Sequence, residues 1–204
     1  MNVFDLDGTI IDITERWYRL HVDLAREHQL PPLEREAYIS LKRDGIPEME
    51  IMKNRGRRER VAAYIAKRQE YIEHPRYIAY DSLVPGIDMV LTAWSRRGDL
   101  LLATNRKNRG LCLAQLDQFA IASHFVQVVL GGAGGKASAI SEQVPLDSLV
   151  GGRFVSDALE DRAAAVQLGM QPITVGYGCR SESYFHKHDV ETIIRCAADL
   201  VPCA

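Results

Sequence analysis

The sequence of 204 residues lacks several features that mark large classes of protein. No apolar run approaches the ~20 residues that a helix needs to cross a bilayer, so we expect no membrane contact. The first residues, MNVFDLDG, contain no basic stretch followed by an apolar one and do not resemble a secretory signal. The four cysteines form no CxxC pair and show no metal-ligand spacing. Reduced thiols in a cytoplasmic protein are the simplest interpretation.

A strong charge of one sign is also missing. The formal net charge is −2, so the whole molecule has no electrostatic attraction to nucleic acid or to a membrane surface. The segment KNRGRRER (53–60) is locally basic, but no aromatic side chains alternate with it to stack on bases. We interpret it as a solvated start of a helix and do not expect nucleic acid as a partner.

Two regimes are visible along the chain. Residues 1–12 and 82–204 contain short apolar runs, each followed by a helical pattern. These runs are VFD at the start, DLLLAT (99–104), FVQVVL (125–130), RFVSD (153–157) and QPITVG (171–176). Strands separated by helices predict an α/β fold with a Rossmann-like parallel sheet. The segment DVETIIRCAADL (189–200) predicts a last helix.

Residues 13–81 contain no convincing strand and predict an all-helical module inserted after the first strand. Trp17, Leu20 and Leu24 recur at helical spacing in its first part. Residues 13–80 hold 14 basic and 11 acidic side chains, a formal charge of +3, which leaves −5 for the remainder. Such charges usually solvate helix faces. The alternative is a basic lid over an acidic site that binds an anionic substrate.

Two carboxylates follow the first strand in the stretch MNVFDLDGTIID. Asp5 and Asp7 are two residues apart, so on an extended strand both side chains point to the same side. In parallel α/β sheets ligands bind at the carboxyl ends of the strands. Two close carboxylates repel each other, and either a hard cation such as Mg²⁺ or protonation of one group would relieve this. A simpler alternative is a pair of aspartates that caps a turn.

Further polar side chains end the other predicted strands. Thr104 and Asn105 follow LLLA, Asp157 ends RFVSD, and Asp161 begins the next helix. Lys136 begins the helix after FVQVVL. Because four strand ends carry such groups, we predict one site at this edge of the sheet.

The glycine-rich stretch GGAGGKA (131–137) at first suggests a nucleotide-binding P-loop, which requires GxxxxGK[ST]. Leu130 replaces the first glycine and Ala137 replaces the hydroxyl that binds Mg²⁺. We therefore reject a P-loop and assign Lys136 to the acidic site.

Taken in order, these motifs resemble the haloacid dehalogenase superfamily of phosphohydrolases. FDLDGTIID resembles its first motif, LLATN the second, Lys136 the third and FVSDALED the fourth, although Ser156 stands where a glycine is usual. The surrounding residues resemble the branch similar to phosphoglycolate phosphatase. The inserted module resembles the helical cap of that family by position and type only. The resemblance implies a core domain of residues 1–12 and 82–204 and a helical cap domain of residues 13–81.

The resemblance also implies a Mg²⁺-dependent phosphatase that acts on a small phosphate monoester. Asp5 would be the nucleophile that forms an aspartyl-phosphate, and Asp7 the general acid and base. Mg²⁺ would be held by Asp5, the backbone carbonyl of Asp7, and Asp157, with Asp161 nearby.

Phosphate binding is implied for a second set of groups. Thr104, Asn105 and backbone N–H groups near Leu6 and Gly8 would contact the phosphoryl oxygens, and Lys136 would neutralise the gathered negative charge.

Other functions remain open at this point. A phosphomutase would use the same residues, whereas a dehalogenase has no use for Asp7. A phosphorylated signalling module and an inactive binding protein are alternatives of another class. Arg43, Lys53 and Arg55 are candidate substrate contacts from the cap. Two histidines, His186 and His188, are more simply surface residues than metal ligands. The substrate and the oligomeric state cannot be predicted from these residues.

Overall fold

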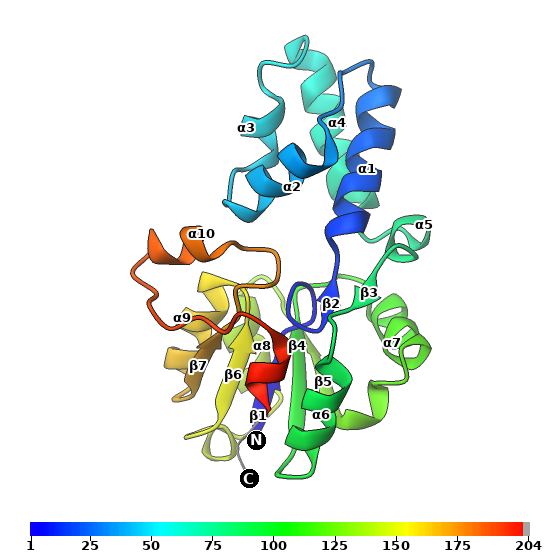
Figure 1. Ribbon diagram of the computed structural model, residues 1–204. Helices are drawn as coiled ribbons and strands as arrows, with labels where there is room; N and C mark the ends of the chain where they lie inside the picture. Colours follow the sequence, from blue (N-terminus) through cyan, green and yellow to red (C-terminus); the bar gives the residue numbers. More distant parts are fainter. Residues whose placement is uncertain (202–204) are drawn as a thin grey trace.

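The computed structural model describes residues 1–201 and centres on a sheet of five parallel strands (Figure 1). The strand order is β5–β4–β1–β6–β7, which confirms the predicted parallel α/β fold. Strand β4 is buried at every position because it lies inside the sheet and is covered on both faces. The strands are β1 (Asn2–Phe4), β4 (Leu100–Thr104), β5 (Phe125–Leu130), β6 (Arg153–Ser156) and β7 (Gln171–Thr174).

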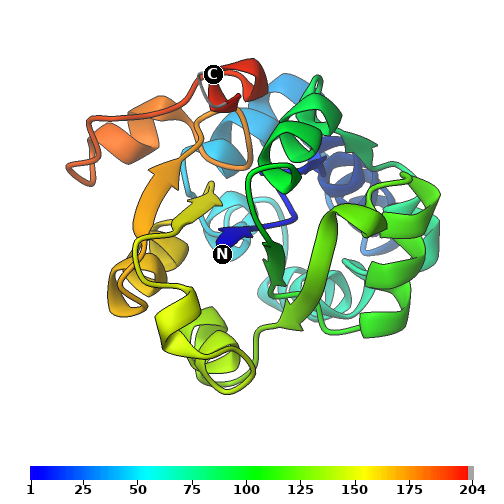
Figure 2. The same cartoon turned by 90° about the horizontal axis from the view of Figure 1, so that it is seen from below.

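Helices cover both faces of this sheet, as Figure 2 shows from below. Successive strand residues point to opposite faces. Val3, Leu101 and Phe154 therefore belong to one apolar cluster with α8 and α9, whereas Phe4 and Leu102 belong to another with α6 and α7. The helices of the core are α6 (Ile87–Ser95), α7 (Arg109–Gln118), α8 (Gly135–Ser141), α9 (Leu159–Gln167) and α10 (Glu182–His186), with short 3-10 turns at Ala122–His124, Leu146–Ser148 and Ala197–Leu200.

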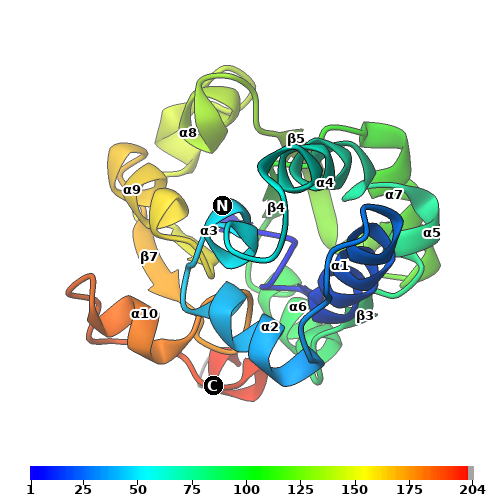
Figure 3. The ribbon, with the colours of Figure 1, turned by 90° about the horizontal axis from the view of Figure 1, so that it is seen from above.

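A group of helices lies beyond the carboxyl ends of the strands (Figures 1 and 3). We call residues 13–81 the helical insert. Its helices are α1 (Thr14–Glu27), α2 (Arg35–Arg43), α3 (Glu48–Met52), α4 (Arg58–Tyr71) and α5 (Pro75–Ile78). The chain enters the insert through β2 (Ile11–Asp12) and returns through β3 (Ser82–Leu83), and these two strands pair antiparallel. The chain therefore passes from the core to the insert and back through one two-stranded stalk.

The C-terminal segment differs from its predicted helix. Between residues 189 and 196 the chain is not helical, and only Ala197–Leu200 forms a 3-10 turn. Ile194 donates its N–H to the Thr174 carbonyl and accepts from the Gly176 N–H, so this segment pairs with the end of the outermost strand. Its β-branched residues also disfavour a helix. The short helix α10, which begins where Ser181 caps it, was not predicted from the sequence.

Within residues 1–201, no helix is both long enough and apolar enough to span a bilayer.

Candidate active site

A cavity of about 260 Å³ lies where the carboxyl ends of β1, β4 and β6 meet the helical insert. Because parallel strands all end on this side, the loops that follow them converge here. The cavity brings together Asp5, Asp7, Thr104, Asn105, Lys136 and Asp157, which the sequence placed at separate strand ends. Its other lining residues are Ile13, Arg16, Trp17, Ile72, Glu73, Arg106, Ala158, Cys179 and Arg180.

Lys136 is a buried residue that lines this cavity. Its Nζ lies 2.5 Å from Oδ1 of Asp5 and 2.7 Å from Oδ2 of Asp161. Burial opposes its charge, but the two carboxylates raise the pKa of Lys136 above its ordinary value. Burial raises the pKa of Asp5 to about 8, with Lys136 opposing the shift and the charges of Asp161 and Asp157 adding to it. This side of the cavity therefore carries more negative charge than Lys136 alone compensates.

Asp157 is held in place by the loop after β7. Its Oδ2 accepts a hydrogen bond of 2.5 Å from the Cys179 N–H. Burial raises the pKa of Asp157 to about 6, although that hydrogen bond and Lys136 oppose the shift. Gly8 packs against this carboxylate with a φ of +86°, and a Cβ at Gly8 would lie 2.0 Å from Oδ2 of Asp157. Only glycine suits both that backbone conformation and that approach.

The acidic side of the cavity fits a hard divalent cation. Asp5 and Asp157 are 6% and 3% exposed, and each engages one carboxylate oxygen in the contacts above. The second oxygen of each accepts no hydrogen bond from any residue in 1–201. Among those residues no three His, Cys, Asp or Glu side chains form a ready metal cluster. Mg²⁺ commonly needs only one or two carboxylates, with water and phosphate oxygens completing its shell.

Asp161 contacts Lys136 and not the loop that holds Asp157. Its Oδ2 accepts the hydrogen bond from Lys136, and burial raises its pKa. In this arrangement Asp161 orients the lysine, and Asp161 itself does not line the cavity that contains Asp5 and Asp157.

Thr104 and Asn105 line the cavity at the end of β4. Thr104 is buried, and its Oγ1 accepts a weak hydrogen bond of 3.3 Å from the Arg106 N–H. Asn105 lies against the glycine-rich turn, where a Cβ at Gly131 would fall 2.2 Å from Oδ1 of Asn105. The first glycine of GGAGGKA therefore makes room for Asn105.

The N–H groups expected to bind phosphate differ in availability. The Gly8 N–H donates to the Ile11 carbonyl at 2.7 Å, so it is used within the turn. The Leu6 and Asp7 N–H groups donate to no acceptor among the described residues. These two groups are therefore the donors that the turn after β1 leaves available.

Asp7 is bound by two arginines that the sequence did not single out. Arg106 donates from Nε to Oδ2 at 2.9 Å and from Nη2 to Oδ1 at 2.6 Å. Arg16, on α1 of the insert, donates from Nη2 to Oδ1 at 2.9 Å. Burial alone would raise the pKa of Asp7, but the two guanidinium groups lower it to about 2. Asp7 is thus an ionised carboxylate in a fixed orientation.

A second buried carboxylate continues this network behind Asp7. Asp81, at the return from the insert, accepts from Nε of Arg16 at 2.8 Å and from Nε2 of Gln115 at 2.8 Å. Gln115 also accepts from Nη1 of Arg106. The network therefore joins α1 and the last residue of the insert to α7 of the core.

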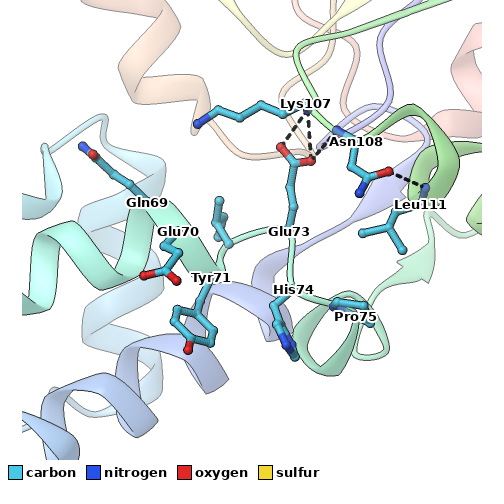
Figure 4. Close-up of a pocket in the computed structure, with 10 residues that line it drawn as sticks. Gln69, Glu70, Tyr71, Glu73, His74, Pro75, Lys107, Asn108 and Leu111 are labelled. Carbon is cyan, nitrogen blue, oxygen red and sulfur yellow. Dashed lines mark hydrogen bonds between the residues drawn. The ribbon is translucent and has the colours of Figure 1, made fainter.

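A separate contact joins the insert to the start of α7. Figure 4 shows the Glu73 carboxylate between the chain segments, accepting from the backbone N–H groups of Lys107 and Asn108 at 3.0 and 3.2 Å. A cavity of about 380 Å³ opens beside it. Glu73 lines both this cavity and the one around Asp5.

The candidate cap contacts lie outside the lining of the Asp5 cavity. Arg43 donates to the Gly176 carbonyl at 2.7 Å, and Lys53 pairs with Glu50 at the surface. Arg55 lies on the insert near His21. The cavity instead contains Arg180, which stacks on Tyr184 and donates to backbone carbonyls.

Of the residues that the sequence missed, only Arg106 gave a local signal. It follows Thr104 and Asn105 directly and so had to lie at the same strand end. Arg16 and Asp81 are 65 residues apart, and nothing in their spacing indicates that they meet.

The fold and the cavity define an α/β protein with an acidic, lysine-centred site at the carboxyl end of its parallel sheet. The profile of the haloacid dehalogenase-like hydrolases matches residues 2–137, which are 136 of the 204 residues. The chain belongs to this family of hydrolases.

Solved structures share the fold across nearly the whole chain. A haloacid dehalogenase-like hydrolase, SP0104 from Streptococcus pneumoniae, is 17% identical with a TM-score of 0.77, covering 98% of this chain and 95% of that one. A putative phosphatase from Clostridium difficile is 20% identical with a TM-score of 0.76, covering 98% and 97%. A predicted phosphoglycolate phosphatase from Haemophilus somnus is 16% identical with a TM-score of 0.71, covering 98% and 96%. No curated protein matches this chain significantly.

Proposed function

We propose that this protein is a Mg²⁺-dependent phosphatase that hydrolyses a small phosphate monoester through a phosphorylated Asp5. The observation that carries the proposal is the buried Asp5, whose Oδ1 lies 2.5 Å from Nζ of Lys136 in a cavity that Asp157 and Thr104 also line. The family match and the structural neighbours named as phosphatases support it.

In the first step an oxygen of Asp5 forms a bond to phosphorus, and the bond from phosphorus to the ester oxygen breaks. Asp7 is ionised in the free protein, so it must first take up a proton; it then gives that proton to the ester oxygen, and an alcohol leaves. Lys136 neutralises negative charge beside the transferred phosphoryl group, while Thr104 and Asn105 contact its oxygens.

In the second step water attacks phosphorus of the aspartyl-phosphate. Asp7 as a carboxylate takes a proton from that water, and the bond between phosphorus and the Asp5 oxygen breaks. Inorganic phosphate leaves, and Asp5 is again a free carboxylate. The two arginines hold Asp7 in one orientation and in its ionised form, which this step requires, and the same contacts make it a weak base.

Mg²⁺ would be held by Asp5, Asp157 and the backbone carbonyl of Asp7, with Asp161 close by. When bound, it supplies positive charge to the phosphate and to these carboxylates. The helical insert acts as the cap in this proposal, since its residues Ile13, Trp17 and Ile72 line the cavity.

Phosphate release from p-nitrophenyl phosphate and from a panel of biological phosphate esters, with Mg²⁺ and with EDTA, tests this function. We expect release that requires Mg²⁺ and falls by at least about 10³-fold in Asp5→Asn. The same assays are examined for isomerised phosphate esters, which would indicate a phosphomutase. Full activity of Asp5→Asn would refute the mechanism.

A further inference from the structure

The orientation of Asp7 is fixed by two arginines, Arg106 and Arg16, which line the same cavity. Arg106 contacts both of its carboxylate oxygens, at 2.9 and 2.6 Å, in the two-bond geometry that only a guanidinium provides. Arg106 is itself 3% exposed and is held by Gln115 on α7. This side chain therefore sets the plane of the Asp7 carboxylate from within the core.

Arg16 approaches the same carboxylate from the helical insert. Its Nη2 lies 2.9 Å from Oδ1 of Asp7 and 2.5 Å from Oδ2 of Asp81. Arg16 is 1% exposed and is the third residue of α1, just beyond β2, whereas Asp81 directly precedes β3. One guanidinium thus connects Asp7 to both ends of the insert, beside the strands of the stalk.

The network is balanced in charge without a ligand. Two arginines, Arg16 and Arg106, face two carboxylates, Asp7 and Asp81, with the neutral Gln115 beside them. The hydrogen bonds among these five side chains form without a bound substrate. A carboxylate that receives three guanidinium hydrogen bonds cannot rotate freely, so its orientation is established before a phosphate ester binds.

We propose that Arg106, assisted by Arg16, is a positioning residue that orients Asp7 toward the water that hydrolyses the aspartyl-phosphate. This inference rests on the proposed phosphatase function and adds two residues to it. The role belongs to the second step because in that step Asp7 acts as a carboxylate, the form that the arginines bind. From an ester whose leaving group needs no proton, the aspartyl-phosphate forms normally when this support is removed, and its hydrolysis becomes slow.

Rapid-mixing kinetics with p-nitrophenyl phosphate and Mg²⁺ separate the two steps. Its good leaving group needs no proton, so p-nitrophenol reports formation of the aspartyl-phosphate and inorganic phosphate reports its hydrolysis. Arg106→Lys keeps the buried charge but cannot make the two-bond contact. We expect this variant to release a burst of about one p-nitrophenol per enzyme, followed by turnover that is about 10- to 100-fold slower than wild type, with little change in KM. Arg16→Lys should show the same pattern more weakly.

Two reference variants serve as the positive and the negative control. Asp7→Asn should give the same burst, because it removes the group that the arginines position. Asp44→Ala removes a different contact between the insert and the core, its hydrogen bond from Ser181 at 2.8 Å, and should behave as wild type. Circular dichroism and thermal unfolding verify that each variant is folded.

The outcomes distinguish failure of the positioning role from failure of the proposed phosphatase function. If Asp7→Asn shows its burst, two results for Arg106→Lys overturn the positioning role. One is an equal slowing of both steps, and the other is unchanged turnover. Unchanged turnover in Asp7→Asn overturns the assigned role of Asp7, and an inactive wild-type protein overturns the proposed function and this inference with it.

Discussion

Nζ of Lys136 lies between Oδ1 of Asp5 and Oδ2 of Asp161, at 2.5 and 2.7 Å, and all three side chains are buried. One positive charge is thereby shared by two carboxylates. Breaking a buried ion pair by removing one partner costs up to ~3–5 kcal/mol, because the remaining charge is left uncompensated.

Replacement of Lys136 by methionine should therefore reduce both stability and activity. We expect the free energy of unfolding in urea to fall by about 2–4 kcal/mol in the absence of Mg²⁺. Phosphate release should fall by at least about 100-fold, since the phosphoryl charge loses its neutralising partner. Lys136→Arg serves as the comparison that keeps the charge. Equal activity in Lys136→Met and wild type would remove Lys136 from the mechanism.

Mg²⁺ should stabilise the folded protein through Asp157. A cation that binds only the folded state raises the midpoint of thermal unfolding. We expect this increase in wild type and its loss in Asp157→Asn, measured by differential scanning fluorimetry with Mg²⁺ or EDTA. Asp117→Asn changes an exposed carboxylate on α7, outside the cavity, and should retain the full increase. A Mg²⁺-dependent increase that survives in Asp157→Asn would place the cation elsewhere.

Two neighbouring glycines provide a matched pair of variants. A Cβ at Gly131 would lie 2.2 Å from Oδ1 of Asn105, whereas a Cβ at Gly132 would meet no atom within 4 Å. Gly131→Ala should displace Asn105 and raise KM for phosphate esters about 10-fold, the effect of losing ~1.4 kcal/mol of binding. Gly132→Ala should leave KM unchanged. If both variants keep the wild-type KM, Asn105 does not bind the substrate phosphate.

Stability should depend on pH through Asp7. The folded-state pKa of about 2 lies below the ordinary value of 3.8, because Arg16 and Arg106 favour the ionised form. The resulting stabilisation is complete above about pH 4 and is lost as the pH falls toward about 2, and it amounts to ~2 kcal/mol. Asp7→Asn should therefore be less stable than wild type at pH 7, with a difference that shrinks in acid. Urea unfolding at several pH values in EDTA measures this.

Asp5 should show the opposite sign in the same experiment. Burial raises its pKa from 3.8 to about 8, so the folded state keeps a proton that the unfolded state has lost. The metal-free wild type should then lose stability as the pH rises from about 4 to about 8, and Asp5→Asn should not show this loss. Parallel pH profiles for the two variants would contradict both assignments.

The sequence predicted the features that depend on local patterns, namely the strands and the polar residues at their ends. Apolar runs such as LLLAT and FVQVVL became buried or half-buried strands, and polar residues at their ends met in one cavity. Parallel strands force that convergence, so the sequence alone was enough to group Asp5, Thr104 and Asp157. The position of Lys136 beside Asp5 likewise agrees with its place at the start of a helix.

Long-range packing determines the rest. Arg106 could have been suspected from its neighbour Thr104, but its partner Asp7 is 99 residues away. The segment after Asp189 has a helical pattern, yet pairing of Ile194 with the edge of the sheet prevails there. Such competition depends on which surfaces are already present, and a local pattern does not contain that information.

The stalk has a consequence for how this protein could have been assembled. Ile11 pairs with Leu83, so a segment of about seventy residues leaves and rejoins the core at neighbouring positions. Adjacent strands are ~4.8 Å apart, a distance that a tight turn can bridge as readily as a whole group of helices. Recombination at this one junction could therefore exchange, enlarge or shorten the insert while Asp5 and Lys136 remain in the core, and a new insert would have to replace the contacts that Arg16 and Asp81 make with the site.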